Sequence, residues 1–110
     1  MSSFNWHGEL FWIHCSLAES FFGEGRFDDA HTHIERAKLP VINDGYRLGR
    51  VMQLQAQFWC GERKFVEAKS ETLRAMDAYE TVGATKDVED CRDILRYIEG
   101  EMEHLVVSGD

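Results

Sequence analysis

The sequence predicts an all-α protein of five helices, and three observations support this fold class. Apolar residues recur at helical spacing along most of the chain, and glycine-bearing breaks divide it into segments of helix length. Only one proline, Pro40, is present, and no alternating run of β-branched residues predicts a strand. With 110 residues, of which 44% are hydrophobic and 12% aromatic, the chain suits one small globular domain over residues 1–110.

The first helix is predicted from about Phe4 to Phe22 and is apolar around most of its girth. The glycines of residues 23–25 end it, because glycine accepts the left-handed backbone that terminates a helix. A helix of this kind needs cover on more than one side. Its two apolar stripes consist of Leu10, Ile13, Leu17 and Phe21, and of Phe11, Cys15, Ala18 and Phe22.

The second helix is predicted over residues 27–38 and the third over about 44–60. Pro40 helps to end the second helix, and Asn43 or Asp44 caps the third by accepting from its free N–H groups. The inward positions are Phe27, Ala30, Ile34 and Ala37 in the second helix, and Leu48, Val51, Met52, Gln55, Phe58 and Trp59 in the third.

Two more helices complete the predicted fold. The fourth begins near Phe65 and ends at Gly83, and the fifth covers about 86–105 with Thr85 or Asp87 as its cap. The inward positions are Phe65, Ala68, Thr72, Ala75 and Tyr79 in the fourth helix, and Val88, Cys91, Leu95, Ile98, Met102 and Leu105 in the fifth.

The chain repeats itself with a period of 38 residues: "FFGEGRFDDA" at 21–30 is followed by "WCGERKFVEA" at 59–68. The repeat predicts two helical hairpins, at about 4–39 and 43–82, and then one single helix. Internal repetition of this kind is typical of a solenoid. The superposed pairs are Ala18 and Ala56, Phe21 and Trp59, Gly23 and Gly61, Phe27 and Phe65, Ala30 and Ala68, and Ala37 and Ala75, with Tyr97 one further shift from Trp59.

These hairpins resemble the tetratricopeptide repeat, on "LAESFFGEGRFDDA" (17–30) and "QAQFWCGERKFVEA" (55–68). The resemblance covers nearly the whole chain from about Leu10 and implies a right-handed α-solenoid closed by a C-terminal capping helix. The family's usual period is about 34 residues, so four residues, about one helical turn, are extra here. We expect them to lengthen the helices near 38–46. The segment "YETVGATKDVEDCRDIL" (79–95) also looks like the long-repeat variants at the ends of fungal multi-repeat proteins.

The resemblance implies a non-catalytic protein–protein interaction scaffold, in which the first helix of each hairpin lines a concave groove for a partner's peptide or helix. For Trp12 and Phe22, packing on neighbouring helices competes with a contact role. A clamp for chaperone C-terminal tails is not expected, because only Arg92 matches its pattern, while Cys15, Glu19, Leu54 and Val88 depart from it. The groove residues implied are Trp12, Cys15, Glu19, Phe22, Arg50, Gln53, Gln57, Cys60 and Arg92.

The first helix carries more apolar surface than one hairpin partner covers. Either the chain is the terminal part of a longer repeat array, or this helix packs on its counterpart in a second copy to form a homodimer or higher assembly. A purely structural role in oligomerisation or capping is therefore an alternative to partner binding. The residues of this expected self-association surface are Phe4, Trp6, Leu10, Phe11 and Ile13.

Charge and cysteine content narrow the expected partners. The net charge is −8 and no basic stripe occurs, so nucleic acid is not expected, and no stretch is apolar enough to predict a membrane partner. From Met76 onward ten acids face three bases, which indicates a solvated acidic end or a face for a basic partner. Three widely spaced cysteines without a paired motif predict a reducing compartment, the cytoplasm.

No residue pattern predicts a catalytic, cofactor or metal site. His7 and His14 share roughly one helix face, but zinc needs about four ligands in tetrahedral reach. The imidazoles of "HTH" at 31–33 fall on nearly opposite faces of a helix. Phosphate-binding, nucleophile-elbow and metalloprotease motifs are absent from the sequence. Enzyme activity is accordingly the third and least favoured hypothesis.

Overall fold

A computed structural model describes the backbone of residues 6–108 and the side chains of residues 10–105. This part of the chain is all helical, with no strand, as the sequence predicts. It contains α1 (Trp6–Gly23), α2 (Phe27–Lys38), the short 3-10 helix η1 (Leu39–Val41), α3 (Gly45–Gly61), α4 (Phe65–Thr81) and α5 (Thr85–Ser108).

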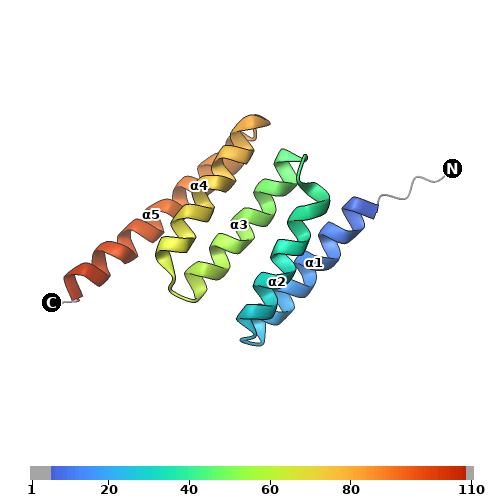
Figure 1. Cartoon of the computed structure of the whole chain (residues 1–110). Helices are drawn as coiled ribbons and strands as arrows, with labels where there is room; N and C mark the ends of the chain where they lie inside the picture. The colour runs from blue at the N-terminus through green and yellow to red at the C-terminus, as the bar shows by residue number, and fades with distance from the viewer. Residues whose placement is uncertain (1–5, 109–110) are drawn as a thin grey trace.

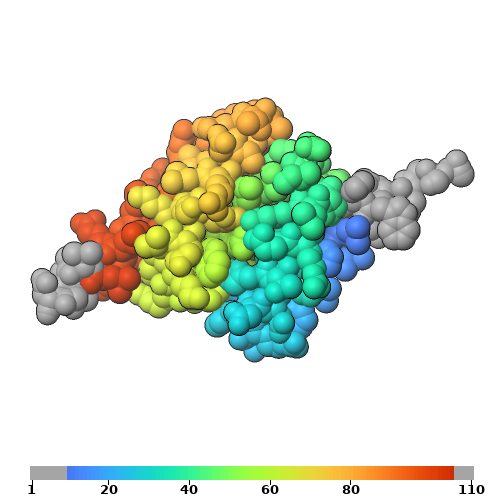
Figure 2. Space-filling view, viewed as in Figure 1, coloured from blue at the N-terminus to red at the C-terminus, as the bar shows by residue number. Residues whose placement is uncertain are grey.

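The helices lie side by side in chain order. Helix α1 packs on α2, α3 packs on α4, and α5 packs on the outer side of α4 (Figure 1). The result is a flat, elongated body with principal dimensions of 63 × 33 × 16 Å. Figure 2 shows the face formed largely by α2 and α4, where successive chain segments form adjacent bands from one end to the other. No helix between residues 6 and 108 has both the length and the apolarity to cross a bilayer.

The alanines of the repeat lie in the interior of the protein. Ala18 and Ala56 are fully buried, and so are the pairs Ala30 with Ala68 and Ala37 with Ala75. A small side chain at a buried position lets two helices pack closely, because protein interiors have little free volume. The matching burial of all three pairs shows that the repeated sequence occupies repeated packing environments.

The two apolar stripes of α1 have different surroundings. Phe11, Cys15 and Ala18 are buried in the core of the first hairpin, whereas Leu10, Ile13 and Leu17 are exposed. The inward positions predicted for α2 to α5 are buried or half-buried, except for Phe27 and Leu105, which are exposed.

Three helices end with the same backbone hydrogen bond. An amide five residues further along the chain donates to the carbonyl of Phe21 at 2.9 Å, of Trp59 at 2.8 Å and of Tyr79 at 3.0 Å. This bond needs a left-handed residue just before the donor. Gly25 and Gly83 supply it with φ of 80° and 69°, which confirms the predicted role of glycine at these two turns.

The second turn departs from that prediction. Its left-handed residue is Arg63, with φ of 61°, at the position that matches Gly25 after the 38-residue shift. Gly61 is the last residue of α3, and its role is steric. A Cβ atom at Gly61 would come within 2.5 Å of Cζ of Phe22, so the aromatic ring of the first turn requires a glycine here.

The connection between the hairpins also differs from expectation. The extra residues do not extend α2, because it ends at Lys38 and is followed by the 3-10 helix η1, which contains Pro40, and then by a short turn. Asp44 caps α3 as predicted, by accepting from the backbone N–H of Arg47 at 3.1 Å. At the start of α5, Thr85 lies inside the helix and does not cap it, while Asp87 lies in the first turn.

Candidate partner-binding groove

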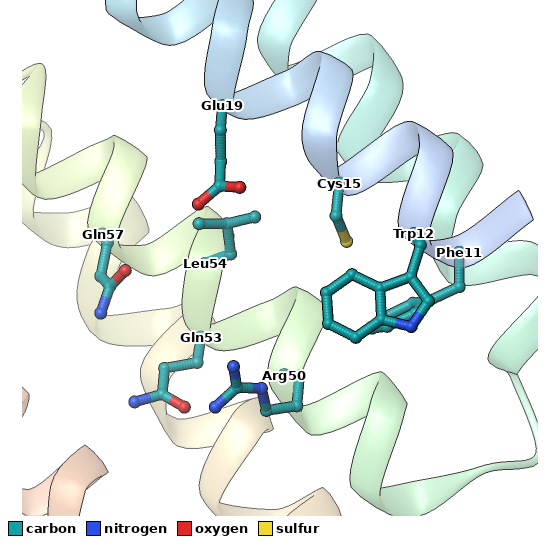
Figure 3. Close-up of a pocket in the computed structure, with 8 residues that line it drawn as sticks. All are labelled: Phe11, Trp12, Cys15, Glu19, Arg50, Gln53, Leu54 and Gln57. Carbon is teal, nitrogen blue, oxygen red and sulfur yellow. The ribbon is translucent and has the colours of Figure 1, made fainter. Parts of the chain in front are cut away.

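A groove of about 190 Å³ lies between α1 and α3, the first helices of the two hairpins (Figure 3). The two helices line opposite walls, and each wall mixes apolar and polar groups. The lining residues are Phe11, Trp12, Cys15 and Glu19 from α1, and Arg50, Gln53, Leu54 and Gln57 from α3.

Trp12 forms the largest apolar part of the α1 wall. Its side chain is 60% exposed, which is unusual for the largest hydrophobic side chain in proteins. The ring of Phe11 supports it from the core in an edge-to-face contact, with ring centroids 5.3 Å apart. The Trp12 indole is therefore held by Phe11 on one side and exposed on the other.

The groove carries one charge of each sign. Glu19 projects from α1, and Arg50 projects from α3 on the other side of Leu54 (Figure 3). Neither side chain takes part in an ion pair with any other residue of the described chain. Both charges are consequently open to a ligand.

A hydrogen bond from the core orients Gln53. The buried Tyr79 of α4 donates its hydroxyl proton to Oε1 of Gln53 at 2.7 Å. A Cβ atom built on Gly49 would lie only 2.8 Å from Cε1 of Tyr79. The absence of a side chain at Gly49 therefore makes room for the Tyr79 ring between α3 and α4. Burial raises the pKa of Tyr79 above its usual value, which keeps the phenol protonated and donating.

Cys15 contributes a neutral thiol to the groove. Burial raises the pKa of Cys15 to about 11, with a further contribution from Glu19 and an opposing one from Arg50. The thiolate is the nucleophilic and metal-binding form of cysteine. A thiol protonated at neutral pH therefore serves the groove as a small apolar group.

The structure brings six of the expected groove residues together: Trp12, Cys15, Glu19, Arg50, Gln53 and Gln57. Leu54 was expected only as a groove position that departs from the chaperone-tail clamp, and Phe11 was expected on the self-association surface. Leu54 follows the groove residue Gln53 in the sequence, and Phe11 precedes the groove residue Trp12. Neighbouring residues of a helix lie about 100° apart around its axis, so superposing the repeats does not easily reveal that both line the same groove.

Three expected groove residues lie elsewhere. Phe22 stacks on Phe58 between the two hairpins, with ring centroids 4.4 Å apart and planes 7° apart. Arg92 borders a separate hollow between α4 and α5, where it pairs with Glu89. Cys60 lines a third hollow beside Tyr97. For Phe22, packing between hairpins is therefore the role that the structure describes.

The expected self-association surface is reduced by one residue. Phe11 does not lie on it, because its side chain is 4% exposed and packs in the core of the first hairpin. Leu10 and Ile13 are exposed on the outer side of α1, and Leu17 continues their row. Phe4 lies outside the described residues, and so does the side chain of Trp6.

Polar networks between the hairpins were not predicted. The imidazole of His31 stacks on Trp59 with centroids 3.8 Å apart, and its Nε2 lies 2.6 Å from Oε2 of Glu62. Nearby, Nζ of Lys38 lies 2.8 Å from Oε2 of the buried Glu71. These contacts depend on how one hairpin is rotated against the next, and a helical pattern does not encode that rotation.

A pair of histidines also meets between α1 and α2, the two helices of the first hairpin. Nδ1 of His14 lies 2.9 Å from Nδ1 of His33, although the two residues belong to different helices. Within the described residues, no group of three or more His, Cys, Asp and Glu side chains is placed to hold a metal ion.

Comparison with known proteins adds no relative: no family model, curated protein or solved structure matches the chain.

Proposed function

We propose that this protein is a non-catalytic interaction scaffold of the tetratricopeptide type, which holds a peptide or helical segment of a partner protein in the groove between α1 and α3. The observation that carries the proposal is the meeting of six side chains, expected on one surface from the repeat, in a single groove. A groove with an apolar platform and a few open polar groups is typical of a binding site.

The repeat geometry supports the same proposal. Two hairpins share buried alanines at equivalent positions and end their first helices with the same backbone bond. Stacked hairpins of this kind form an α-solenoid, and we infer a right-handed one with α5 as its cap. Such a body offers an open concave surface, which suits an elongated ligand.

A library of random-sequence dodecapeptides, displayed on beads, tests the function directly. We expect the wild-type protein to retain a subset of peptides that Arg50→Glu and Trp12→Ala no longer retain. Lys86→Glu and Leu39→Ala are matched controls, because these side chains are among the most exposed of the described chain and lie outside the groove. Capture that survives both groove substitutions, or no capture at all, contradicts the proposal.

The row of Leu10, Ile13 and Leu17 favours a second candidate function, self-association through α1. These three exposed apolar side chains share one helix face and lie on the outer side of the first hairpin. In this alternative, the chain oligomerises or caps a larger assembly and binds nothing else. Sedimentation equilibrium of wild type and Ile13→Glu tests it: a monomer at every concentration excludes a second copy as the occupant.

A further inference from the structure

The orientation of the Gln53 amide determines which chemical group the α3 wall recognises. Its carbonyl oxygen already accepts the hydroxyl proton of Tyr79. The remaining group, the amide NH₂, carries two donors and no acceptor. Because Tyr79 is buried and wedged against Gly49, it holds the amide in this orientation and so acts as a positioning residue.

Arg50 adds further donors to the same wall. It precedes Gln53 by three residues, which places both side chains on one face of α3, and both line the groove (Figure 3). A guanidinium has five donors and no acceptor, and this one pairs with no carboxylate within the described residues. In Figure 3 the carbonyl oxygen of Gln53 lies toward Arg50 and its amide nitrogen points away from Arg50, so the donors of this wall lie on either side of that oxygen. Donors of this kind favour a carboxylate ligand.

The opposite wall has the opposite preference. Glu19 is the only carboxylate among the groove residues, and its oxygens accept hydrogen bonds. A ligand that is acidic along its whole length would meet repulsion here, whereas a basic side chain at this point would pair with Glu19. The groove therefore favours a ligand with a negative charge facing α3 and a positive charge facing α1.

An extended peptide supplies that order simply. Successive side chains of an extended chain point to opposite sides, so neighbouring residues face opposite walls of a groove. We propose that the groove selects an extended peptide segment with an acidic and a basic residue next to each other, the acid bound by Arg50 and Gln53 and the base by Glu19. This inference rests on the proposed function and names its ligand class.

Paired peptides test the acidic half of the inference. From the bead library, each retained N-acetylated and C-terminally amidated dodecapeptide with an internal Asp or Glu is compared with its Asn or Gln counterpart by fluorescence anisotropy. We expect the acidic member to bind about tenfold more tightly, the ratio typical of one charge-assisted hydrogen-bonded contact.

Gln53→Glu is the decisive variant. It keeps the oxygen that accepts from Tyr79 and replaces the donating amide by an acceptor, so the packing of α3 on α4 is unchanged. The acid preference should disappear or reverse. Tyr79→Phe keeps the ring against Gly49 but releases the amide, and it should reduce the preference severalfold. Glu19→Gln should remove the preference for a neighbouring Lys or Arg while leaving the acid preference in place.

The possible results separate this inference from the proposed function. Capture that depends on Trp12 and Arg50 but is equal for acid and amide peptides overturns the inference and leaves the scaffold function standing. An unchanged acid preference in Gln53→Glu overturns the inference as well. If only peptides with a free C-terminal carboxylate bind preferentially, Arg50 and Gln53 recognise the end of a chain and not an internal acidic residue. That result overturns the proposed internal acid–base pattern. Loss of all groove-dependent capture overturns both proposals.

Discussion

The ring of Phe22 occupies the space that a side chain at position 61 would need. Its Cζ would lie 2.5 Å from a Cβ atom built on Gly61, so the turn of the first hairpin fits directly against the end of α3. Phe22 also stacks on Phe58 one turn earlier in α3. This contact holds the two hairpins together alongside the stacking of His31 on Trp59 and the pairing of Lys38 with Glu71.

Gly61→Ala should destabilise the protein by about 1–3 kcal/mol, the usual cost of forcing an extra carbon into a packed site. Gly23→Ala is the matched control, because Gly23 occupies the equivalent position in the first turn and a Cβ atom there would have no neighbouring atom within 4 Å. That variant should be neutral or up to about 1 kcal/mol more stable, since alanine favours helix. Urea unfolding measures both, and equal losses would contradict the steric explanation.

Arg63→Gly should be more stable than Arg63→Ala by about 1 kcal/mol, because Arg63 has a left-handed backbone that side chains with a Cβ atom disfavour. The alanine variant isolates this backbone effect. Both substitutions remove the ion pair with Glu101 and the contact of the guanidinium with the Phe65 ring. Thermal unfolding followed by circular dichroism compares them, and identical stabilities would show that the turn relaxes without cost.

The buried pair of Lys38 and Glu71 should show strong energetic coupling. A double-mutant cycle with Lys38→Met and Glu71→Gln should give a coupling free energy of about 1–3 kcal/mol, because Glu71 is buried and its partner is mostly so. The exposed pair of Lys86 and Asp90 in α5 is the reference and should give less than about 0.5 kcal/mol. Coupling of equal size in the two cycles would contradict the burial argument.

Stability should fall as the solution is acidified, in part through His14. Burial, followed by the nearby His33 and Arg36, lowers the pKa of His14 below its ordinary value of 6.5. Between about pH 6.5 and the lowered pKa of the folded state, His14 is protonated in the unfolded chain but not in the folded chain. The free energy of unfolding therefore decreases as the pH drops below about 6.5. Chemical unfolding between about pH 7.5 and pH 5.5 should show a smaller loss for His14→Gln than for wild type. Equal pH slopes would exclude His14 as a contributor.

Helical periodicity predicted the helices and the buried stripes, and the resemblance to the tetratricopeptide repeat implied six of the groove residues. The spacing of Phe11, Cys15 and Ala18 distinguishes one face of α1, and the 38-residue repeat carries that face to α3. Local backbone rules predicted the left-handed turns at Gly25 and Gly83, because these rules depend on nearby residues alone. For the same reason Asp44 was identifiable as one of two capping candidates.

Features that depend on neighbouring helices were not predictable. The stripe pattern of α1 shows two apolar faces but does not say which one the second hairpin covers, so Phe11 was placed on the outer surface. Gly49 in the sequence looks like a weak point of a helix, and its function appears only when the Tyr79 ring is seen against it. The bond that orients Gln53 spans 26 residues and two helices, which no local pattern encodes.

The body of this protein is only 16 Å across its thinnest direction, which is less than twice the width of a helix, about 10 Å. A slab of this kind has a central plane in place of a central point. Inserting another hairpin would widen the slab and leave the surroundings of every helix unchanged, except at the seam. Gene duplication could therefore extend such a protein one hairpin at a time, because only the newly formed contacts between neighbouring hairpins would need to be stable.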